Sequence, residues 1–374
     1  MSYKHDVCIV GLKCRDLLVG ADMPRYLGGI ERMLVALARG LDDAGHRVAF
    51  ITFDETRGQI EDADGITIFP AFDPEAGIRG IRAIHPKLTS LTAAMKRADA
   101  PVYLQMGAGI ETTMTLIATR LLRRRMVFCL ASDSDSLPET PLIYSDIESK
   151  LYKWALRRAD DLVSQTIAQE QMLKTHYALT STIIPMPHHP TRPPPALAKR
   201  APDDPRDILW VGRIVEGKRL ERYVDVAERM PEYQFHVVGS PNQDSAYSQS
   251  VVDRARNTPN VNVHGRVGED ELFELYCRSG VLCCTSEIEG FPATFIEAWS
   301  FGMPVVTTFD PDGVVTESGL GLVVDTVDEI ETALRRLFDE PQLHFETGSA
   351  CRTYYENNFT TAAVVPQFAA LMCQ

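Results

Sequence analysis

Short apolar runs alternate with amphipathic stretches along almost the whole chain. From Gly29 to Gly40 the apolar residues recur at steps of three and four, which predicts a helix with one apolar face. The run Val7–Gly11 before it predicts a buried strand, and further strands are expected at 47–53, 66–70, 101–106, 126–131, 161–165 and 182–185. This alternation of strands and helices is typical of a parallel sheet that is covered on both faces.

A proline-rich segment, residues 188–206, interrupts the pattern and predicts a semi-rigid linker, with His188 and His189 exposed at the hinge. The alternation then resumes, with strands expected at 207–212, 234–238, 261–264, 281–285, 304–308 and 321–324. The pattern therefore predicts an α/β protein of two facing, doubly wound parallel-sheet domains, residues 1–187 and 207–354. Because such sheets bind ligands beyond the carboxyl ends of their strands, the site is expected in a cleft between the domains.

Composition narrows the class of protein. The chain has 374 residues, of which 45% are hydrophobic and 24% charged, which fits two globular domains and excludes disordered or fibrous classes. No apolar run suits a signal peptide or a membrane span, and eight cysteines without a CxxC pair suggest buried free thiols, so a cytoplasmic location is expected. The net charge of −13 falls almost wholly on residues 191–374, which argues against nucleic-acid binding.

The loop Val211–Arg219 is the first candidate for chemistry. Gly212 and Gly217 allow the backbone to turn closely around a ligand, while Arg213 and Lys218 supply positive charge at the start of a helix expected at 220–230. This combination predicts a pyrophosphate-binding loop. It nearly matches a P-loop, but Arg219 stands where Ser or Thr would bind magnesium. A solvated basic loop remains the simpler alternative.

A second candidate loop leads from the strand at 281–285 into a helix that starts near Pro292. Glu289 and Glu297 lie on either side of that helix start, where free amides can bind a phosphate and carboxylates can accept hydrogen bonds from sugar hydroxyls. Taken singly, Glu289 could be an ordinary acidic loop residue and Glu297 a solvated helix residue. Together they indicate a site for a nucleotide-sugar.

The stretch EGFPATFIE, residues 289–297, resembles the E-x7-E motif of the retaining glycosyltransferases of family four, which have the GT-B fold. The stretches GRIVEGKRL, FHVVGSP, VNVHGRV and GLGLVV are similar to that family's C-terminal domain in order and spacing, over residues 207–340. The resemblance implies that Arg213 and Lys218 neutralise the donor diphosphate. It implies that Glu289 binds the donor sugar and Glu297 the ribose, with Arg213, Lys218 and Glu289 as the catalytic group.

The same resemblance implies further donor contacts, a metal-independent reaction, and no cofactor beyond a UDP- or GDP-sugar donor. Gly28 and Gly29 would close on the phosphates or the acceptor, residues 265–267 would contact the base, and a C-terminal helix at 355–374 would cross back to the first domain. The implied donor-binding residues are Gly28, Gly29, Gly212, Gly265, Arg266, Val267, Gly290, Phe291, Pro292, Ala293, Thr294 and Glu297.

The first domain offers candidates for the acceptor side. Gln105 stands where the family often has a histidine, and an amide can hydrogen-bond but cannot act as a base. Asp133 and Asp135 follow a strand; they form either a turn or helix cap, or a D-x-D metal motif. The basic run Arg120–Arg125 either complements a helix dipole or contacts an anionic membrane that carries a lipid-linked acceptor.

These observations favour a retaining glycosyltransferase that moves a sugar from a nucleotide-diphosphate-sugar to a saccharide or carrier-linked acceptor. Two alternatives are a sugar-nucleotide 2-epimerase of the same fold and a non-catalytic nucleotide-sugar binding protein. A dehydrogenase fits poorly, because Thr112 stands where the dinucleotide fingerprint beginning at Gly107 needs a glycine.

Overall fold

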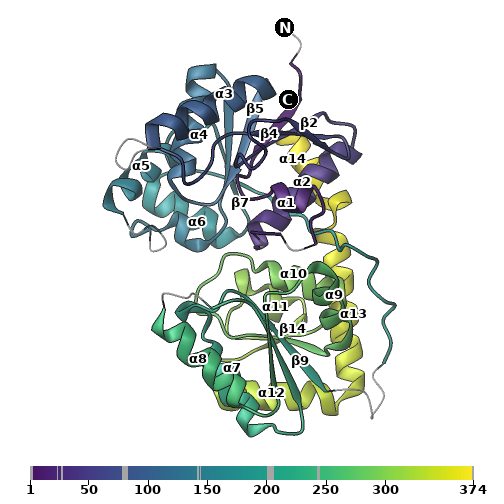
Figure 1. Ribbon diagram of the computed structural model, residues 1–374. Helices are drawn as coiled ribbons and strands as arrows, with labels where there is room; N and C mark the ends of the chain where they lie inside the picture. Colours follow the sequence, from purple (N-terminus) through teal and green to yellow (C-terminus); the bar gives the residue numbers. More distant parts are fainter. Residues whose placement is uncertain are drawn as a thin grey trace. The chain divides into compact units, whose positions relative to one another are not determined.

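The computed structural model describes residues 3–22, 24–26, 28–77, 83–140, 143, 145–199, 206–241 and 245–372. It divides the chain into two compact units: unit 1 comprises Met1–His189 with Thr360–Gln374, and unit 2 comprises Pro190–Phe359. Each unit is built around its own sheet (Figure 1). Two α/β domains with parallel sheets are therefore confirmed.

The sheet of unit 1 has the strand order β3-β4-β2-β1-β5-β6-β7-β8. All neighbouring strands are parallel except β3, which is antiparallel to β4. The strands are β1 (Val7–Val10), β2 (Val48–Thr52), β3 (Glu61–Ala63), β4 (Ile66–Pro70), β5 (Val102–Met106), β6 (Arg125–Cys129), β7 (Asp161–Ser164) and β8 (Thr182–Ile183). The central strands β1, β2 and β5 are buried at every position, as expected for a sheet with both faces covered.

The helices of unit 1 connect these strands and supply the rest of its core. The main helices are α1 (Arg15–Leu18), α2 (Gly29–Asp43), α3 (Thr89–Ala98), α4 (Ile110–Leu122), α5 (Asp146–Leu156), α6 (Ile167–Tyr177) and α14 (Thr361–Met372), with short turns η1 (Ala83–Leu88) and η2 (Asp133–Ser136). Helix α14 packs against α2, where Gly40 leaves room for Val365. The C-terminal helix is thus part of unit 1.

Unit 2 has a six-stranded parallel sheet with the order β11-β10-β9-β12-β13-β14. Its strands are β9 (Asp207–Val211), β10 (Gln234–Val238), β11 (Val261–Gly265), β12 (Val281–Cys284), β13 (Val305–Thr307) and β14 (Gly321–Val323). The first strand of the unit lies in the middle, and the connections run outward from it in both directions. The order therefore reverses between β9 and β12, which is where open α/β sheets bind ligands.

Helices α7 to α13 complete unit 2. They are α7 (Leu220–Arg229), α8 (Ala246–Asn257), α9 (Glu269–Arg278), α10 (Ala293–Ser300), α11 (Val314–Glu317), α12 (Val327–Asp339) and α13 (Pro341–Asn358), with turns η3 (Glu216–Lys218) and η4 (Pro311–Gly313). The chain leaves α13 at Phe359 and begins α14 at Thr361. The prediction of one helix over 355–374 is therefore wrong within the described residues, because its first residues belong to the end of α13.

The predicted linker also differs from its expected form. Its described part, 188–199, contains neither helix nor strand, and from Pro190 on it belongs to unit 2, where Arg352 donates to the Pro195 carbonyl at 3.2 Å and Leu197 packs against Gly302. His188 is half-buried rather than exposed, and burial together with the positive charge of Arg32 lowers its pKa to about 3. The linker is therefore attached to unit 2 at Pro195 and Leu197, although most of its described residues are exposed.

Six of the seven described cysteines are buried and none of the seven is bonded to another, while Cys277 is exposed. In the part of the chain that the structure describes, no helix combines the length and the apolar character needed to span a bilayer.

Candidate functional site

The two loops singled out in the sequence follow β9 and β12, on either side of the point where the strand order of unit 2 reverses. Direct hydrogen bonds hold these loops together. The Thr285 hydroxyl donates to the Lys218 carbonyl at 2.7 Å, and the Glu287 amide donates to the Gly217 carbonyl at 3.0 Å. The site therefore lies at the carboxyl edge of the sheet, where parallel strands place ligand-binding loops.

Lys218 and Glu289, which are 71 positions apart in sequence, form a direct ion pair between these loops. Only 23% of the Lys218 side chain and 14% of the Glu289 side chain are exposed, so the pair is screened less by solvent than a surface pair. The Arg213 side chain, by contrast, is exposed and makes no ion pair or hydrogen bond with any other described residue. The predicted catalytic group thus consists of one engaged cation, one engaged carboxylate and one free guanidinium.

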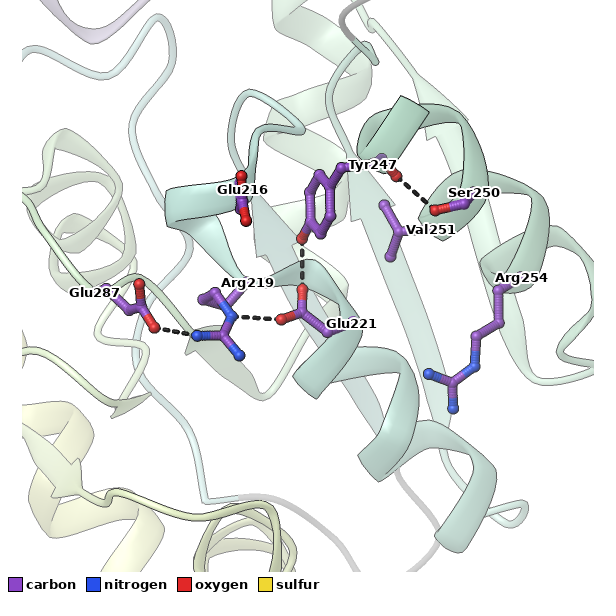
Figure 2. A pocket seen from close by; sticks show the side chains of 8 residues that line it. All are labelled: Glu216, Arg219, Glu221, Tyr247, Ser250, Val251, Arg254 and Glu287. Carbon is purple, nitrogen blue, oxygen red and sulfur yellow. Dashed lines mark hydrogen bonds and ion pairs between the residues drawn. The ribbon is translucent and has the colours of Figure 1, made fainter. Parts of the chain in front are cut away.

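Arg219 fixes the shape of the first loop, a role that the sequence analysis missed. Its backbone has a left-handed conformation (φ 50°) between η3 and α7, and its guanidinium pairs with both Glu221 and Glu287. Figure 2 shows Arg219 between these two carboxylates, with the Tyr247 hydroxyl donating to Glu221. The residue that excludes a P-loop is therefore a bridge between the two loops.

A cavity of about 620 Å³ lies beside this bridge (Figure 2). Both loops and helix α8 contribute to it, and none of the predicted donor-binding residues is among its described lining. The lining residues are Glu216, Arg219, Glu221, Tyr247, Ser250, Val251, Arg254 and Glu287.

Glu297 lies inside α10 and is buried, with 5% of its surface exposed. The Tyr276 hydroxyl donates to its carboxylate at 2.7 Å. The alternative of a solvated helix residue is therefore wrong. The sequence held a signal for this, because Glu297 falls among Phe295, Ile296, Ala298 and Trp299, all of which are buried.

The start of α10 combines structural and accessible residues. Phe291 is buried against Trp299 and Phe359, with ring centroids 5.9 and 5.1 Å away, and so anchors the loop. Pro292 precedes the first turn, and no side chain caps the helix. Ala293 and Thr294 are half-exposed, while Gly290 is buried. Of this predicted group, the first-turn backbone of α10 is the part that a phosphate could reach.

A third part of the candidate site lies where β9, β10 and β11 end, and it is built from glycines that approach one another closely. The Gly239 amide donates to the Gly265 carbonyl at 2.8 Å, and a side chain at Gly239 would collide with the Gly212 carbonyl. Gly239 was missed in the sequence analysis, although Gly212 and Gly265 were not. Of the two residues after Gly265, Arg266 is exposed and Val267 is buried.

The first-domain glycines lie at the start of α2. Gly28 is its N-cap in an extended conformation, Gly29 is its first residue, and no side chain caps the helix. A side chain at Gly28 would collide with the Glu31 carboxylate. Because the Glu31 carboxylate is the end of a flexible side chain and Gly28 has an extended backbone, the local geometry does not by itself require a glycine here.

Gln105 is buried near the carboxyl end of β5, with 5% of its surface exposed. Its amide nitrogen donates to the carbonyls of Met106 and Gly107, both at 2.8 Å. Its Oε1 has no hydrogen-bond partner among the described residues. Gln105 therefore holds the backbone at the end of β5 through its amide nitrogen, while its Oε1 is a buried acceptor without a described partner.

Asp133 and Asp135 form the short turn η2 rather than an open metal motif. The Asp135 carboxylate accepts hydrogen bonds from the amides of Ala131 at 2.8 Å and Ser132 at 3.3 Å. Burial raises the pKa of Asp135 to about 6, although these hydrogen bonds oppose the shift. Asp135 is thus a buried cap, which contradicts its place among the acceptor contacts. Asp133 is half-buried and accepts a hydrogen bond from Gln169 at 3.2 Å.

The arginines at 120–125 are mostly engaged within unit 1. Three of the four form ion pairs with aspartates, and the fourth, Arg123, is exposed. The pairs are Arg120 with Asp160 at 2.9 Å, Arg124 with Asp99 at 3.0 Å and Arg125 with Asp161 at 2.8 Å. This run therefore stabilises the end of α4 and the start of β6, and it offers little free charge to a membrane.

The two units coincide with two matches to family models. Residues 27–192 match the model described as Glycosyltransferase Family 4, and residues 197–354 match the model described as Glycosyl transferases group 1. The chain belongs to the GT-B glycosyltransferases. A GT-B architecture also appears in the solved structure of Anabaena Alr3699/HepE in complex with UDP-glucose, which has a TM-score of 0.78 with 13% identity and covers 98% of this chain and 99% of that one.

Curated relatives of this GT-B glycosyltransferase include an uncharacterised glycosyltransferase of Haemophilus influenzae, 24% identical over 217 residues, 54% of this chain and 58% of the relative. Another is the O-antigen biosynthesis glycosyltransferase WbnH of Escherichia coli, 28% identical over 136 residues, 36% of this chain and 38% of the relative. The chain spans about half the length of the curated relatives it matches.

Proposed function

We propose that this chain is a retaining glycosyltransferase that moves a hexose from a nucleotide-diphosphate-sugar to a saccharide or carrier-linked acceptor in glycoconjugate synthesis. The observation that carries the proposal is the direct pairing of Lys218 with Glu289 across the two loops at the β9–β12 switch point. A nucleotide-diphosphate-sugar carries its phosphates and its sugar next to each other, so its site needs a cation and a carboxylate close together. Lys218 and Glu289 are in direct contact. The O-antigen role of one relative supports the acceptor class.

The donor diphosphate would be bound by Lys218, by Arg213 and by the uncapped first turn of α10. As the glycosidic bond breaks, negative charge grows on the leaving diphosphate, so fixed cations and amides stabilise the transition state more than the ground state. No step in this scheme needs a metal ion. A UDP- or GDP-sugar fits the scheme equally well, and UDP-glucose is the ligand in the HepE structure.

The Lys218–Glu289 pair would couple binding of the diphosphate to binding of the donor sugar. When the diphosphate takes Lys218 as its partner, the Glu289 carboxylate loses a hydrogen-bond donor and becomes available to accept from the hydroxyls of the donor sugar. Binding of the phosphates and binding of the sugar would then support each other. Glu297, held by Tyr276, would accept from the ribose.

On the acceptor side, Gly28–Gly29 would offer an uncapped helix start, and the buried Oε1 of Gln105 would accept a hydrogen bond only if binding of the acceptor uncovers it. An amide cannot take a proton from the acceptor hydroxyl. The departing phosphate oxygen would instead take that proton, while the acceptor oxygen bonds to the anomeric carbon on the face that the diphosphate leaves, without a protein nucleophile. Analysis of the anomeric configuration of the product by NMR tests retention, and an inverted product would refute it.

A panel of UDP-, GDP- and ADP-sugars tests the activity through slow hydrolysis of the donor without acceptor. We expect hydrolysis of one donor class, and its loss in Glu297→Ala. As a matched control, Glu346→Ala changes a glutamate on α13 that lies outside both loops, and it should keep the activity.

The rival functions give different outcomes in the same panel. Formation of an epimer of the donor sugar without acceptor would identify a 2-epimerase. Tight donor binding without hydrolysis or transfer to any acceptor would identify a non-catalytic binding protein. The family models and the O-antigen relative favour transfer over both.

A further inference from the structure

Helix α5 of unit 1 exposes an apolar stripe that no part of the described chain covers. Ile147, Leu151 and Trp154 are 72%, 38% and 37% exposed. Steps of four and three place these residues on one face of the helix. In the described chain 11 large hydrophobic side chains are exposed, and three of them lie on α5, a helix of only 11 residues. Such a concentration marks an interaction surface, whereas scattered exposed residues do not.

The opposite face of α5 is firmly packed, so the stripe is not the result of a loosely placed helix. Tyr152, Ala155 and Leu156 are buried in the core of unit 1. The Tyr152 hydroxyl donates to the Asp135 carbonyl at 2.6 Å. At its first turn, Glu148 accepts from the Ile110 amide at 2.9 Å. The outward direction of the stripe is therefore fixed by its buried side.

Basic side chains border the apolar stripe. Lys150 on α5 and Arg157 and Arg158 directly after it are exposed, and the Arg158 guanidinium lies 5.1 Å from the centre of the Trp154 ring. The acidic residues of the helix, Asp146 and Glu148, are confined to its first turn, and Glu148 is turned toward Ile110. Cations beside aliphatic and indole side chains complement an anionic lipid surface, where phosphates and the acyl boundary lie next to each other.

We infer that α5 docks this protein on an anionic membrane surface, with Ile147, Leu151 and Trp154 in the interface and Lys150, Arg157 and Arg158 at the lipid phosphates. The helix has 11 residues and lies along the surface of unit 1, so it would lie on the membrane and not cross it. Through Tyr152 the docked helix contacts η2, beside the predicted acceptor side. The inference goes beyond the proposed function and can be tested without any substrate.

The fluorescence of Trp154 can report binding of α5 to lipid vesicles. The other two tryptophans, Trp210 and Trp299, are buried at 2% and 0% exposure, so a change in emission on binding vesicles reports on Trp154. The full chain is mixed with phosphatidylcholine vesicles or with vesicles that contain about one third phosphatidylglycerol, at low and high salt. We expect flotation and a blue shift of emission with the anionic vesicles only, and a weaker effect at high salt.

Four variants test whether the exposed residues of α5 form the membrane-binding surface. Ile147→Ser/Leu151→Ser should weaken vesicle binding at least about tenfold, because two apolar side chains no longer enter the interface. Lys150→Gln should weaken it about fivefold. Trp154→Phe should still bind but lose the blue shift. Ile60→Ser changes an isoleucine that is 50% exposed beside β3, at the opposite edge of the sheet, and should bind like wild type.

Several results would overturn the inference: no binding of wild-type protein to anionic vesicles, equal binding by the Ile147→Ser/Leu151→Ser variant, or equal weakening by Ile60→Ser. A wild-type dimer that this double variant converts to a monomer, without vesicle binding, would assign the stripe to a second copy of the chain instead. Donor hydrolysis by each variant is measured in parallel. Loss of vesicle binding with retained hydrolysis separates this surface from the proposed catalytic site.

Discussion

Replacing Lys218 by alanine removes the cation that touches Glu289 at the junction of the two loops. Two separate losses are expected. The leaving diphosphate loses a fixed positive charge, and the Glu289 carboxylate, which is only 14% exposed, loses its partner. The backbone at this position should stay in place, since the Thr285 hydroxyl binds the Lys218 carbonyl and not its side chain.

The magnitudes of the two losses differ. Loss of a preorganised group that stabilises developing charge costs about 3–4 kcal/mol, so kcat should fall about 10²- to 10³-fold. The stability loss lies between that of an exposed ion pair, below about 1 kcal/mol, and that of a fully buried one, about 3–5 kcal/mol. With about one fifth of each side chain exposed, we expect about 1–3 kcal/mol, or a fall in Tm of several degrees.

The double variant Lys218→Ala/Glu289→Gln separates these losses. It removes the unpaired carboxylate, so it should recover most of the Tm, while kcat stays as low as in Lys218→Ala. The assay is steady-state donor turnover together with thermal unfolding. Arg222→Gln is the matched control, because this cation on α7 has a similar exposure of 26% and lies 3.9 Å from Glu287 without facing Glu289. Wild-type turnover in a folded Lys218→Ala protein would refute the assignment of the site.

Three further changes test other parts of the structure. Gly239→Ala should destabilise unit 2 by about 1–3 kcal/mol or more, since its methyl group meets backbone, while Gly217→Ala enters open space and should be neutral; equal Tm values would contradict this packing. Burial raises the pKa of Asp135 to about 6, so this carboxyl binds a proton more tightly in the folded protein than in the unfolded chain. Its protonation therefore contributes most to the free energy of unfolding below about pH 4, and this contribution is lost as the pH rises through about 6. The Tm advantage of wild type over Asp135→Asn should therefore grow as the pH falls, and a pH-independent difference would speak against a buried carboxyl. Tyr276→Phe leaves the buried Glu297 without its 2.7 Å donor and should raise KM for the donor about tenfold with little change in kcat; an unchanged KM would show that this hydrogen bond does not position Glu297.

Local sequence patterns were sufficient for most elements of the fold. Strands such as β1 and β9 are continuous apolar runs because both faces of a parallel sheet are covered, and helices such as α2 have one apolar face because the other meets water. β3 escaped prediction, since its three residues are Glu-Asp-Ala and it exists only through pairing with β4 at the sheet edge. Short polar strands of this kind have no periodic signal of their own.

The residue types of the site were also readable from the sequence, because glycines, cations and carboxylates in strand-to-helix loops have a limited set of uses. Which of them meet was decided by the strand order, which brings Lys218 next to Glu289 although they are 71 positions apart in sequence. Burial was likewise a tertiary outcome. Asp135 became a buried cap and three of the four arginines at 120–125 became ion-pair partners, while Ile147, Leu151 and Trp154 on α5 stay exposed because no described residue packs over them. The sequence by itself determined the chemical groups and the elements that carry them, and only the packing of those elements determined which groups contact each other and which face solvent.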